Sequence, residues 1–79
     1  MAQYQIRAAA QGLYTVQRDG LTIAKIANTR GVWTLYAVDE YGQMLGDGRK
    51  DVTHILHHDD QLQPAIAAFF AADYHPTGA

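Results

Sequence analysis

One dipeptide constrains the fold of this chain more than any other feature. Asp19-Gly20 lies between two runs rich in strand-forming residues, 13–18 and 21–26. A type I′ turn needs positive φ at both central residues, and Asp-Gly between alternating apolar runs is the strongest short signal for it. The sequence therefore predicts a β-hairpin over residues 13–26.

A two-residue turn would also fix the register of the hairpin. Arg18 would face Leu21, and Val16 would face Ile23. A slip of one residue would exchange the two faces of the sheet. In this register one face carries Tyr14, Val16, Leu21 and Ile23, and the other carries Leu13, Thr15, Thr22, Ala24 and Ile26.

The run 32–38, Val-Trp-Thr-Leu-Tyr-Ala-Val, predicts a third strand after a turn at 28–31. A four-residue loop would set Ala27 against Val32, placing Tyr36 and Val38 on the first face and Trp33 and Leu35 on the second. A three-residue loop with Gly31 in the left-handed conformation would exchange these assignments. Because the run is apolar on both sides, we expect a central strand buried on both faces.

Shorter segments complete the predicted sheet. Residues 4–7 alternate and form either a short first strand or the start of a longer one. A turn at 39–42 leads into an edge strand at 43–45, and the glycines of 46–48 end the sheet.

The hydrophobic period changes after Asp51, which is a favourable N-cap residue. Residues 52–58 predict a short helix or turn, with a strand through 52–55 as the alternative. Asp59 or Asp60 would cap a second helix, with Pro64 in its first turn. One apolar stripe on this helix consists of Leu62, Ile66, Phe69 and Phe70. The helical part spans about 52–73, and residues 74–79 form a tail.

These elements predict a single α+β domain over residues 1–79. Its core would be an antiparallel three- to four-stranded β-meander packed by a C-terminal α-helix. A chain of 79 residues is near the lower limit for an independent core. We therefore expect a protein partner or a homodimer interface to contribute to stability.

Composition excludes several classes of function. The chain has no cysteine and no serine, which removes disulfides, thiolate zinc sites and serine or cysteine nucleophiles. The formal net charge of −2 argues against a dedicated nucleic-acid binder. No signal peptide is visible, and the apolar run 65–72 is too short to span a bilayer. We expect a cytoplasmic protein.

Polar clusters give no catalytic or metal motif. His54, His57 and His58 lack the glutamate of an HExxH motif and a full set of zinc ligands. Turn and capping roles explain the carboxylates Asp39, Glu40, Asp59 and Asp60, although together they could form an acidic surface. We therefore predict a non-enzymatic protein without metal or cofactor.

The predicted sheet has apolar side chains on both faces, and one helix can cover only one of them. The uncovered face would expose Trp33 and Leu35, or alternatively Tyr14, Val16 and Tyr36. Exposed tryptophan and tyrosine are favoured anchors of protein interfaces. Alternatively, residues 2–12, the histidine segment or the tail would fold over that face. The predicted partner-binding residues are Trp33, Tyr36, Tyr14, Asp39, Glu40, Asp59 and Asp60.

In size and in the layout around residues 13–20 and 32–38, the chain resembles small inhibitors carried by phages and mobile elements, including anti-CRISPR proteins. The resemblance implies that the protein binds a CRISPR effector in the bacterial cytoplasm and blocks its recognition of target DNA. Carboxylates would meet Lys and Arg that normally hold phosphates. The alternative is a small sheet-type DNA-binding domain of a mobile element, which resembles the integrase arm-binding layout. That mode requires several Arg or Lys on the open face of the sheet.

Overall fold

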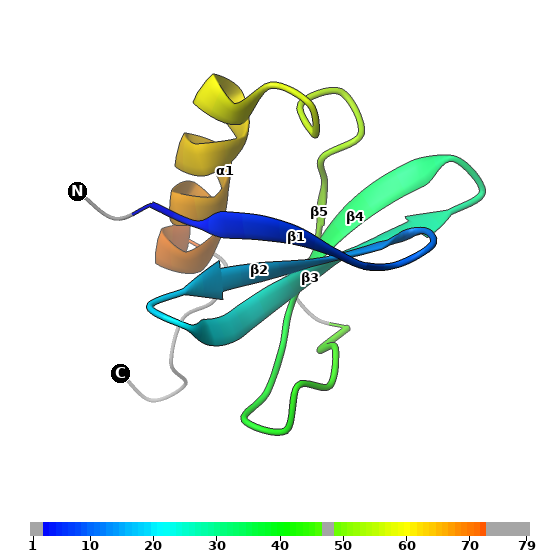
Figure 1. The fold of residues 1–79 in the computed structure, drawn as a ribbon. Coiled ribbons are helices and arrows are strands. Elements are labelled where there is room, and N and C mark those ends of the chain that lie inside the picture. The colour runs from blue at the N-terminus through cyan, green and yellow to red at the C-terminus, as the bar shows by residue number, and fades with distance from the viewer. Residues whose placement is uncertain (1–2, 47–48, 73–79) are drawn as a thin grey trace.

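A computed structural model describes residues 3–46 and 49–72. It contains one antiparallel sheet in the strand order β1-β2-β3-β4-β5, with a single helix across one face (Figure 1). This confirms the predicted α+β meander with a C-terminal helix. The elements are β1 (Gln5–Ala10), β2 (Leu13–Arg18), β3 (Leu21–Thr29), β4 (Val32–Ala37), β5 (Lys50–Asp51) and α1 (Asp59–Ala72).

The β2–β3 hairpin turns at Asp19-Gly20, as predicted. Both residues have positive φ, 54° and 82°, and Arg18 pairs with Leu21. Beyond Gln17 the predicted register is wrong, because Val16 pairs with Ala24 and not with Ile23. Ile23 is an extra residue on β3 and forms a β-bulge.

The β3–β4 hairpin has a shorter loop than predicted. Arg30 and Gly31 have φ of 55° and 83°, and Thr29 pairs with Val32. The loop therefore has two residues, so the four-residue and three-residue loops are both wrong. The Asn28 side chain accepts a hydrogen bond from the Gly31 N–H at 2.9 Å and stabilises this turn. The strand at the centre of the sheet is β3, not the run 32–38.

The bulge decides which residues share the face under α1. It brings even-numbered residues of β2 onto the same face as Ala24 and Ile26 of β3. Leu35 pairs with Ile26 and joins them. The prediction that Leu35 or Val16 lies on an uncovered face is therefore wrong, since both are fully buried.

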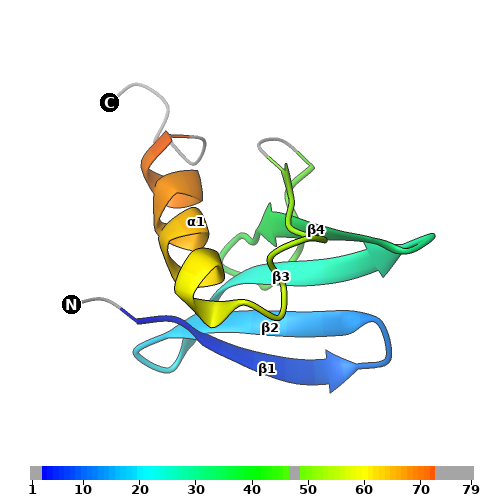
Figure 2. The same cartoon turned by 90° about the horizontal axis from the view of Figure 1, so that it is seen from above.

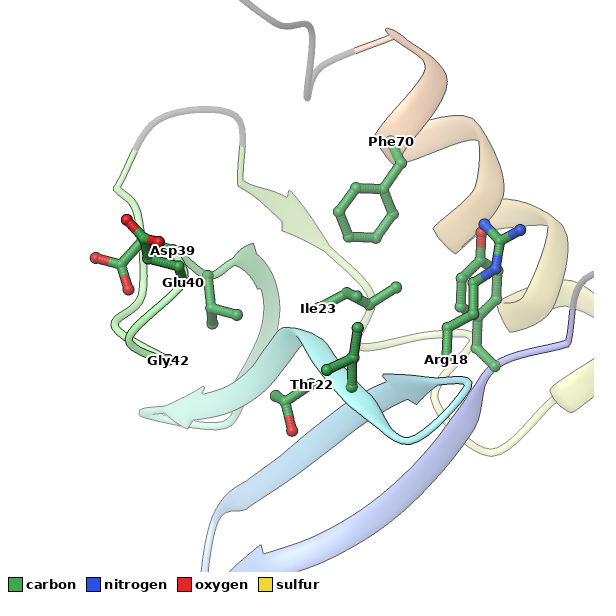
Figure 3. Close-up of a pocket in the computed structure, with 10 residues that line it drawn as sticks. Arg18, Thr22, Ile23, Asp39, Glu40, Gly42 and Phe70 are labelled. Atoms are coloured by element: carbon green, nitrogen blue, oxygen red, sulfur yellow. The ribbon is translucent and has the colours of Figure 1, made fainter.

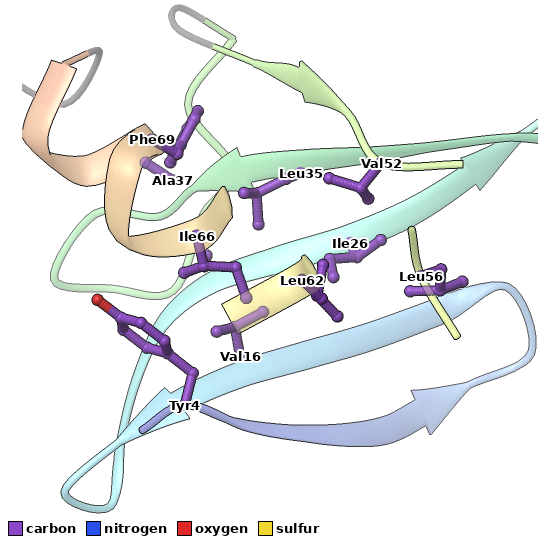
Figure 4. Close-up of a cluster of buried hydrophobic side chains, with 11 residues drawn as sticks. Tyr4, Val16, Ile26, Leu35, Ala37, Val52, Leu56, Leu62, Ile66 and Phe69 are labelled. Carbon is purple, nitrogen blue, oxygen red and sulfur yellow. The ribbon is translucent and has the colours of Figure 1, made fainter. Parts of the chain in front are cut away.

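Side chains of α1 complete this core. Leu62, Ile66 and Phe69 are buried against the sheet (Figure 4). Phe70 is half-buried and packs against this core. Full burial of a large apolar side chain contributes about 1.5–3 kcal/mol. The predicted apolar stripe is confirmed. The core residues are Tyr4, Val16, Ala24, Ile26, Leu35, Ala37, Val52, Leu56, Leu62, Ile66 and Phe69.

The start of α1 differs from the prediction. The carbonyl of His58 accepts hydrogen bonds from the Gln61 and Leu62 N–H groups, so His58 and neither aspartate holds the cap position. Asp59 and Asp60 lie in the first turn, where acidic side chains interact favourably with the helix dipole. Pro64 is the sixth helical residue and therefore lies in the second turn. It removes one backbone hydrogen bond, the one to Asp60.

The chain between β4 and α1 also departs from the prediction. The sheet does not end at 46–48, because β5 follows and pairs with Thr34 and Leu35. In the predicted edge strand 43–45, only Met44 forms an isolated bridge, to Val38. Residues 53–57 are turns, as the prediction of a helix or turn over 52–58 allows, and the alternative strand through 52–55 is wrong. The turns follow Asp51, whose Oδ1 accepts the Thr53 N–H at 2.8 Å.

β1 is a separate first strand, as in the first of the two predicted alternatives, but it extends to Ala10 and forms one edge of the sheet. A turn at 11–12 separates it from β2, so the alternative of one long strand is wrong. Tyr4, just before β1, is tied to α1 by two hydrogen bonds of 2.7 Å. Its N–H donates to Gln63 Oε1, and its carbonyl accepts from Gln63 Nε2. The predicted tail 74–79 lies outside the described residues. No helix within 3–46 and 49–72 is long and apolar enough to cross a membrane.

Candidate functional site

A cavity of about 720 Å³ opens at the end of the sheet near the β2–β3 turn (Figure 3). We call it the hairpin pocket. Four separate parts of the chain form it: the residue before β1, the hairpin, the turn that follows β4, and the last turns of α1. It is lined by Tyr4, Arg18, Leu21, Thr22, Ile23, Val38, Asp39, Glu40, Gly42 and Phe70.

Most of the wall of the hairpin pocket is apolar. Ile23, the bulged residue, and Phe70 line it from opposite sides (Figure 3). Phe70 stacks on Tyr4 with ring centroids 6.5 Å apart and meets Phe69 edge-on at 5.2 Å. Because Phe69 is a core residue, these contacts fix the position of the Phe70 ring.

Large apolar side chains are exposed around the same pocket. Leu21 lines it and is 69% exposed, since it lies directly after the turn. Tyr41 and Met44, on the segment after β4, are 82% and 47% exposed. Tyr41 adjoins the lining residues Glu40 and Gly42 in the chain. An apolar cavity with exposed apolar neighbours is the usual form of a binding site.

The acidic side of the hairpin pocket has one structural carboxylate and one exposed carboxylate. Asp39 Oδ1 accepts the N–H groups of Tyr41 and Gln43, both at 2.9 Å, and so holds the turn. Glu40 is exposed and makes no ion pair with any residue that the structure describes. Arg18, on the other side, lies 4.0 Å from Asp19 in an exposed pair that contributes little to stability. The pocket thus offers a basic and an acidic side.

The predicted aromatic residues do not form one site. The rings of Tyr14 and Trp33 meet at 5.2 Å. They share the helix-side face and reach across β3, since Tyr14 pairs with Ile26 and Trp33 with Asn28. Both are half-buried and cover the part of the core that α1 does not reach.

Tyr36 lies on the opposite face of the sheet. There it is opposite Lys25, which is opposite Thr15, which in turn is opposite Arg7. We call this cross-strand line the open-face row. It contains two cations, and neither forms an ion pair within residues 3–46 and 49–72.

The acidic residues are also divided between two places. Asp59 and Asp60 begin α1, whereas Phe70 near its end lines the hairpin pocket. Ten residues of helix separate these positions by about 15 Å. Asp59 Oδ1 accepts a hydrogen bond from Gln63 Nε2 at 3.1 Å. The four predicted carboxylates therefore do not form one acidic surface.

The described residues hold no constellation for metal binding. No group of three or more His, Asp or Glu side chains among them lies close enough to hold an ion. His54, His57 and His58 are exposed on the turn segment. Among the residues that the structure describes, Asp51 alone has a clearly shifted pKa, which is lowered by hydrogen bonds from the Thr53 hydroxyl and N–H. These bonds stabilise the turn and indicate no catalytic role.

Sequence reasoning found Asp39 and Glu40 but missed Leu21, Ile23, Tyr41 and Phe70 as residues of one region. The pocket forms where four segments of the chain meet, which the hydrophobic period within each segment does not reveal. No family model, curated protein or solved structure matches this chain. The candidate site therefore rests on its geometry alone.

Proposed function

We propose that the protein is a non-enzymatic inhibitor that binds another protein through the hairpin pocket. The observation that supports this is the exposed Leu21 beside an apolar cavity of about 720 Å³. Exposed apolar side chains of this size cost free energy in water and gain it when a partner covers them. Tyr41 adds an aromatic anchor, a residue type enriched among binding hot spots.

The charges around the hairpin pocket select the kind of partner. Glu40 and the turn held by Asp39 present negative charge to whatever fills the cavity. Lys or Arg on the partner would complement them and steer association. Surfaces that bind nucleic acid carry such residues. Together with the resemblance in size and layout to phage-encoded inhibitors, this makes a CRISPR effector complex the first partner to test.

The test of the apolar contact uses two lysine substitutions. Leu21→Lys changes the exposed residue of the pocket, and Val32→Lys changes an exposed apolar residue at the β3–β4 turn, 42% exposed. Purified CRISPR effector complexes would be mixed with each variant, and target-DNA binding measured by gel shift. The parent and Val32→Lys block DNA binding, whereas Leu21→Lys needs at least about tenfold more protein, as expected for a hot-spot residue.

Two outcomes test the identity of the partner and the site of contact separately. If no effector loses DNA binding, the CRISPR assignment is wrong. Affinity capture from a bacterial lysate with the same two variants then tests the pocket itself. A captured protein that Leu21→Lys and Val32→Lys bind equally well would show that the hairpin pocket is not the contact site.

Charge reversal tests the acidic side. Glu40→Lys weakens inhibition, and Asp60→Lys, also exposed but at the start of α1 and away from the pocket, leaves it unchanged. Asp39 is unsuitable for this test because its carboxylate holds the turn. Equal inhibition by Glu40→Lys and the parent would exclude electrostatic recognition at this site.

A second candidate function is DNA binding by the open-face row. Arg7 and Lys25 lie on a face that α1 does not cover, and Tyr36 could stack on a base. Two phosphate contacts on duplex DNA would give a slope of only about −1.8 in log affinity against log salt. A gel shift at low salt that is abolished by Arg7→Ala with Lys25→Ala would support this function, and no shift would exclude it.

A further inference from the structure

Tyr41 is the most exposed of the large hydrophobic residues that the structure describes, with 82% of its surface open to solvent. Its chain neighbours Glu40 and Gly42 line the hairpin pocket, whereas Tyr41 does not. Figure 2 shows that β4, which leads into this segment, ends at the same end of the sheet as the β2–β3 turn. A partner that fills the pocket can therefore also contact Tyr41 beside it.

Backbone hydrogen bonds close the turn that carries Tyr41. Asp39 N–H donates to the Gln43 carbonyl at 3.0 Å, and Gly42 N–H donates to the Asp39 carbonyl at 3.0 Å. Gly42 has a φ of 80°, which glycine adopts without steric cost. We call residues 39–43 the Asp39 turn. Neither of these two bonds involves the N–H of Tyr41.

The Asp39 side chain supplies the hydrogen bond at Tyr41. Its Oδ1 accepts the N–H groups of Tyr41 and Gln43, both at 2.9 Å. Aspartate and asparagine side chains commonly form such bonds to the backbone two residues further on. A single oxygen atom therefore fixes the peptide group before Tyr41 relative to the base of the turn.

The Asp39 turn is also attached to the wall of the hairpin pocket. Val38 N–H donates to the Ile23 carbonyl at 3.3 Å, and Val38 forms an isolated bridge with Met44. Val38 and Ile23 both line the pocket. Hydrogen bonds within the free protein thus fix the backbone at Tyr41 with respect to the cavity.

A fixed turn strengthens binding because ordering a flexible loop opposes association. Tyrosine provides a large contact area with only two side-chain torsions to immobilise. On a flexible loop this advantage is reduced, since the backbone must also be ordered when the partner binds. Tyr41 on a preformed turn is therefore a stronger anchor than the same residue on a flexible loop.

The two adjacent carboxylates of this turn differ in what they offer a partner. Asp39 is half-buried and uses Oδ1 within the turn, whereas Glu40 is exposed and forms no ion pair within the described ranges 3–46 and 49–72. The bonds at Asp39 need an oxygen acceptor and not a negative charge. Asparagine has a carbonyl oxygen with two lone pairs and can accept both.

We propose that Asp39 is a positioning residue, which holds Tyr41 in its binding geometry through Oδ1 while Glu40 supplies the charge that the partner contacts. This inference rests on the proposed function, because Asp39 acts on the partner through Tyr41. It assigns geometry to one carboxylate and charge to its neighbour. Asparagine can therefore replace Asp39, whereas alanine cannot.

The first test compares two substitutions of Asp39. Asp39→Ala is expected to weaken binding about tenfold or more, and Asp39→Asn is expected to rescue it to within about threefold of the parent. Gln43→Ala is the matched control, because its exposed side chain lies in the same turn and its backbone bonds remain. Binding is titrated with the effector complex that the parent inhibits or, in its place, with the protein captured from the lysate.

A double substitution shows whether Asp39 acts through Tyr41. Tyr41→Ala alone is expected to weaken binding about tenfold. Adding Asp39→Ala to Tyr41→Ala is expected to change the affinity by less than about twofold, because the anchor that Asp39 positions is already absent. A role for Asp39 that does not depend on Tyr41 would add its full effect in this background.

Hydrogen exchange measures the turn in the absence of a partner. The amides of Tyr41 and Gln43 are expected to exchange about tenfold faster in Asp39→Ala and to stay close to the parent in Asp39→Asn. Circular dichroism establishes that each variant is folded.

Three results would overturn the inference while the proposed function stands: equal exchange in Asp39→Ala and the parent, equally weak binding by Asp39→Asn and Asp39→Ala, or full additivity with Tyr41→Ala. A parent that binds neither the effector complexes nor a lysate protein would overturn the proposed function and, with it, the role of Tyr41 as an anchor. Faster exchange in Asp39→Ala would then assign Asp39 to the stability of the turn alone.

Discussion

The face of the sheet under α1 and the face opposite to it are built from the same four long strands but carry different chemistry. Val16, Ile26 and Leu35 lie under α1 and are fully buried. On the opposite face, Thr15, Lys25 and Tyr36 are only half-buried. Because one extra residue at Ile23 determines which side chains of β2 and β3 share a face, the separation of core from surface depends on a single bulge.

The largest expected difference in stability between the two faces comes from truncating one aromatic ring on each. Phe69→Ala removes a core ring and is expected to lower the free energy of unfolding by about 3–5 kcal/mol. Tyr36→Ala on the opposite face is expected to cost about 1 kcal/mol or less. Phe70→Ala should lie between them, because Phe70 is half-buried. Urea unfolding of the three variants measures the order, and equal losses for Phe69→Ala and Tyr36→Ala would contradict it.

The second test removes the hydrogen bonds between α1 and the residue that precedes β1. Gln63→Ala leaves the Tyr4 N–H and carbonyl without their partners. We expect a loss of about 1–3 kcal/mol, since these groups are partly buried. Gln61→Ala is the control, because Gln61 is exposed on the same helix. Hydrogen exchange at Tyr4 should accelerate in Gln63→Ala alone.

A smaller effect concerns Tyr14 and Trp33, which cover the part of the helix-side face beyond α1. A double-mutant cycle between Tyr14→Leu and Trp33→Leu should give a coupling energy of about 0.5–1.5 kcal/mol. The same cycle between Tyr14 and Tyr36, on opposite faces, should give a coupling near zero. Equal couplings would mean that the two faces are not separated as described.

The smallest effect concerns Asp51, on the face opposite to α1. Hydrogen bonds from Thr53 lower the pKa of this carboxyl in the folded chain. A lowered folded-state pKa contributes stability above the unfolded value, about 3.9, and that stability is lost as pH falls through the folded-state pKa. Thermal unfolding from pH 5 downwards should therefore show a smaller drop for Asp51→Asn than for the parent. Identical pH profiles would contradict the assignment.

Local features explain which parts of the fold could be predicted. Asp19-Gly20 predicts its own turn because few residues tolerate positive φ. Arg30-Gly31 forms the same kind of turn, but an arginine at φ of 55° carries no such signal, so its loop was predicted too long. The bulge at Ile23 could not be predicted either, because isoleucine favours a regular strand and gives no signal for a bulge.

The candidate site was less accessible to prediction than the fold. Leu21, Phe70 and Asp39 come from segments that are far apart in the chain and meet only in the folded molecule. Wrong registers placed Leu35 on the uncovered face in one alternative and Val16 in the other, whereas both supply the core. The predicted role of Tyr14 and Trp33 in partner binding stays a prediction, with a structural role now established beside it.

The two hydrogen bonds between Tyr4 and Gln63 have a consequence for the order of folding. Fifty-nine positions of chain separate the two residues, whereas the hairpins at Asp19-Gly20 and Arg30-Gly31 close locally. During synthesis the meander can form before α1 has left the ribosome, and Val16, Ile26 and Leu35 then face water without their cover. Such exposed apolar surface favours aggregation and chaperone binding. The protein is therefore most prone to aggregation between the time when β4 leaves the ribosome and the time when α1 packs on the sheet.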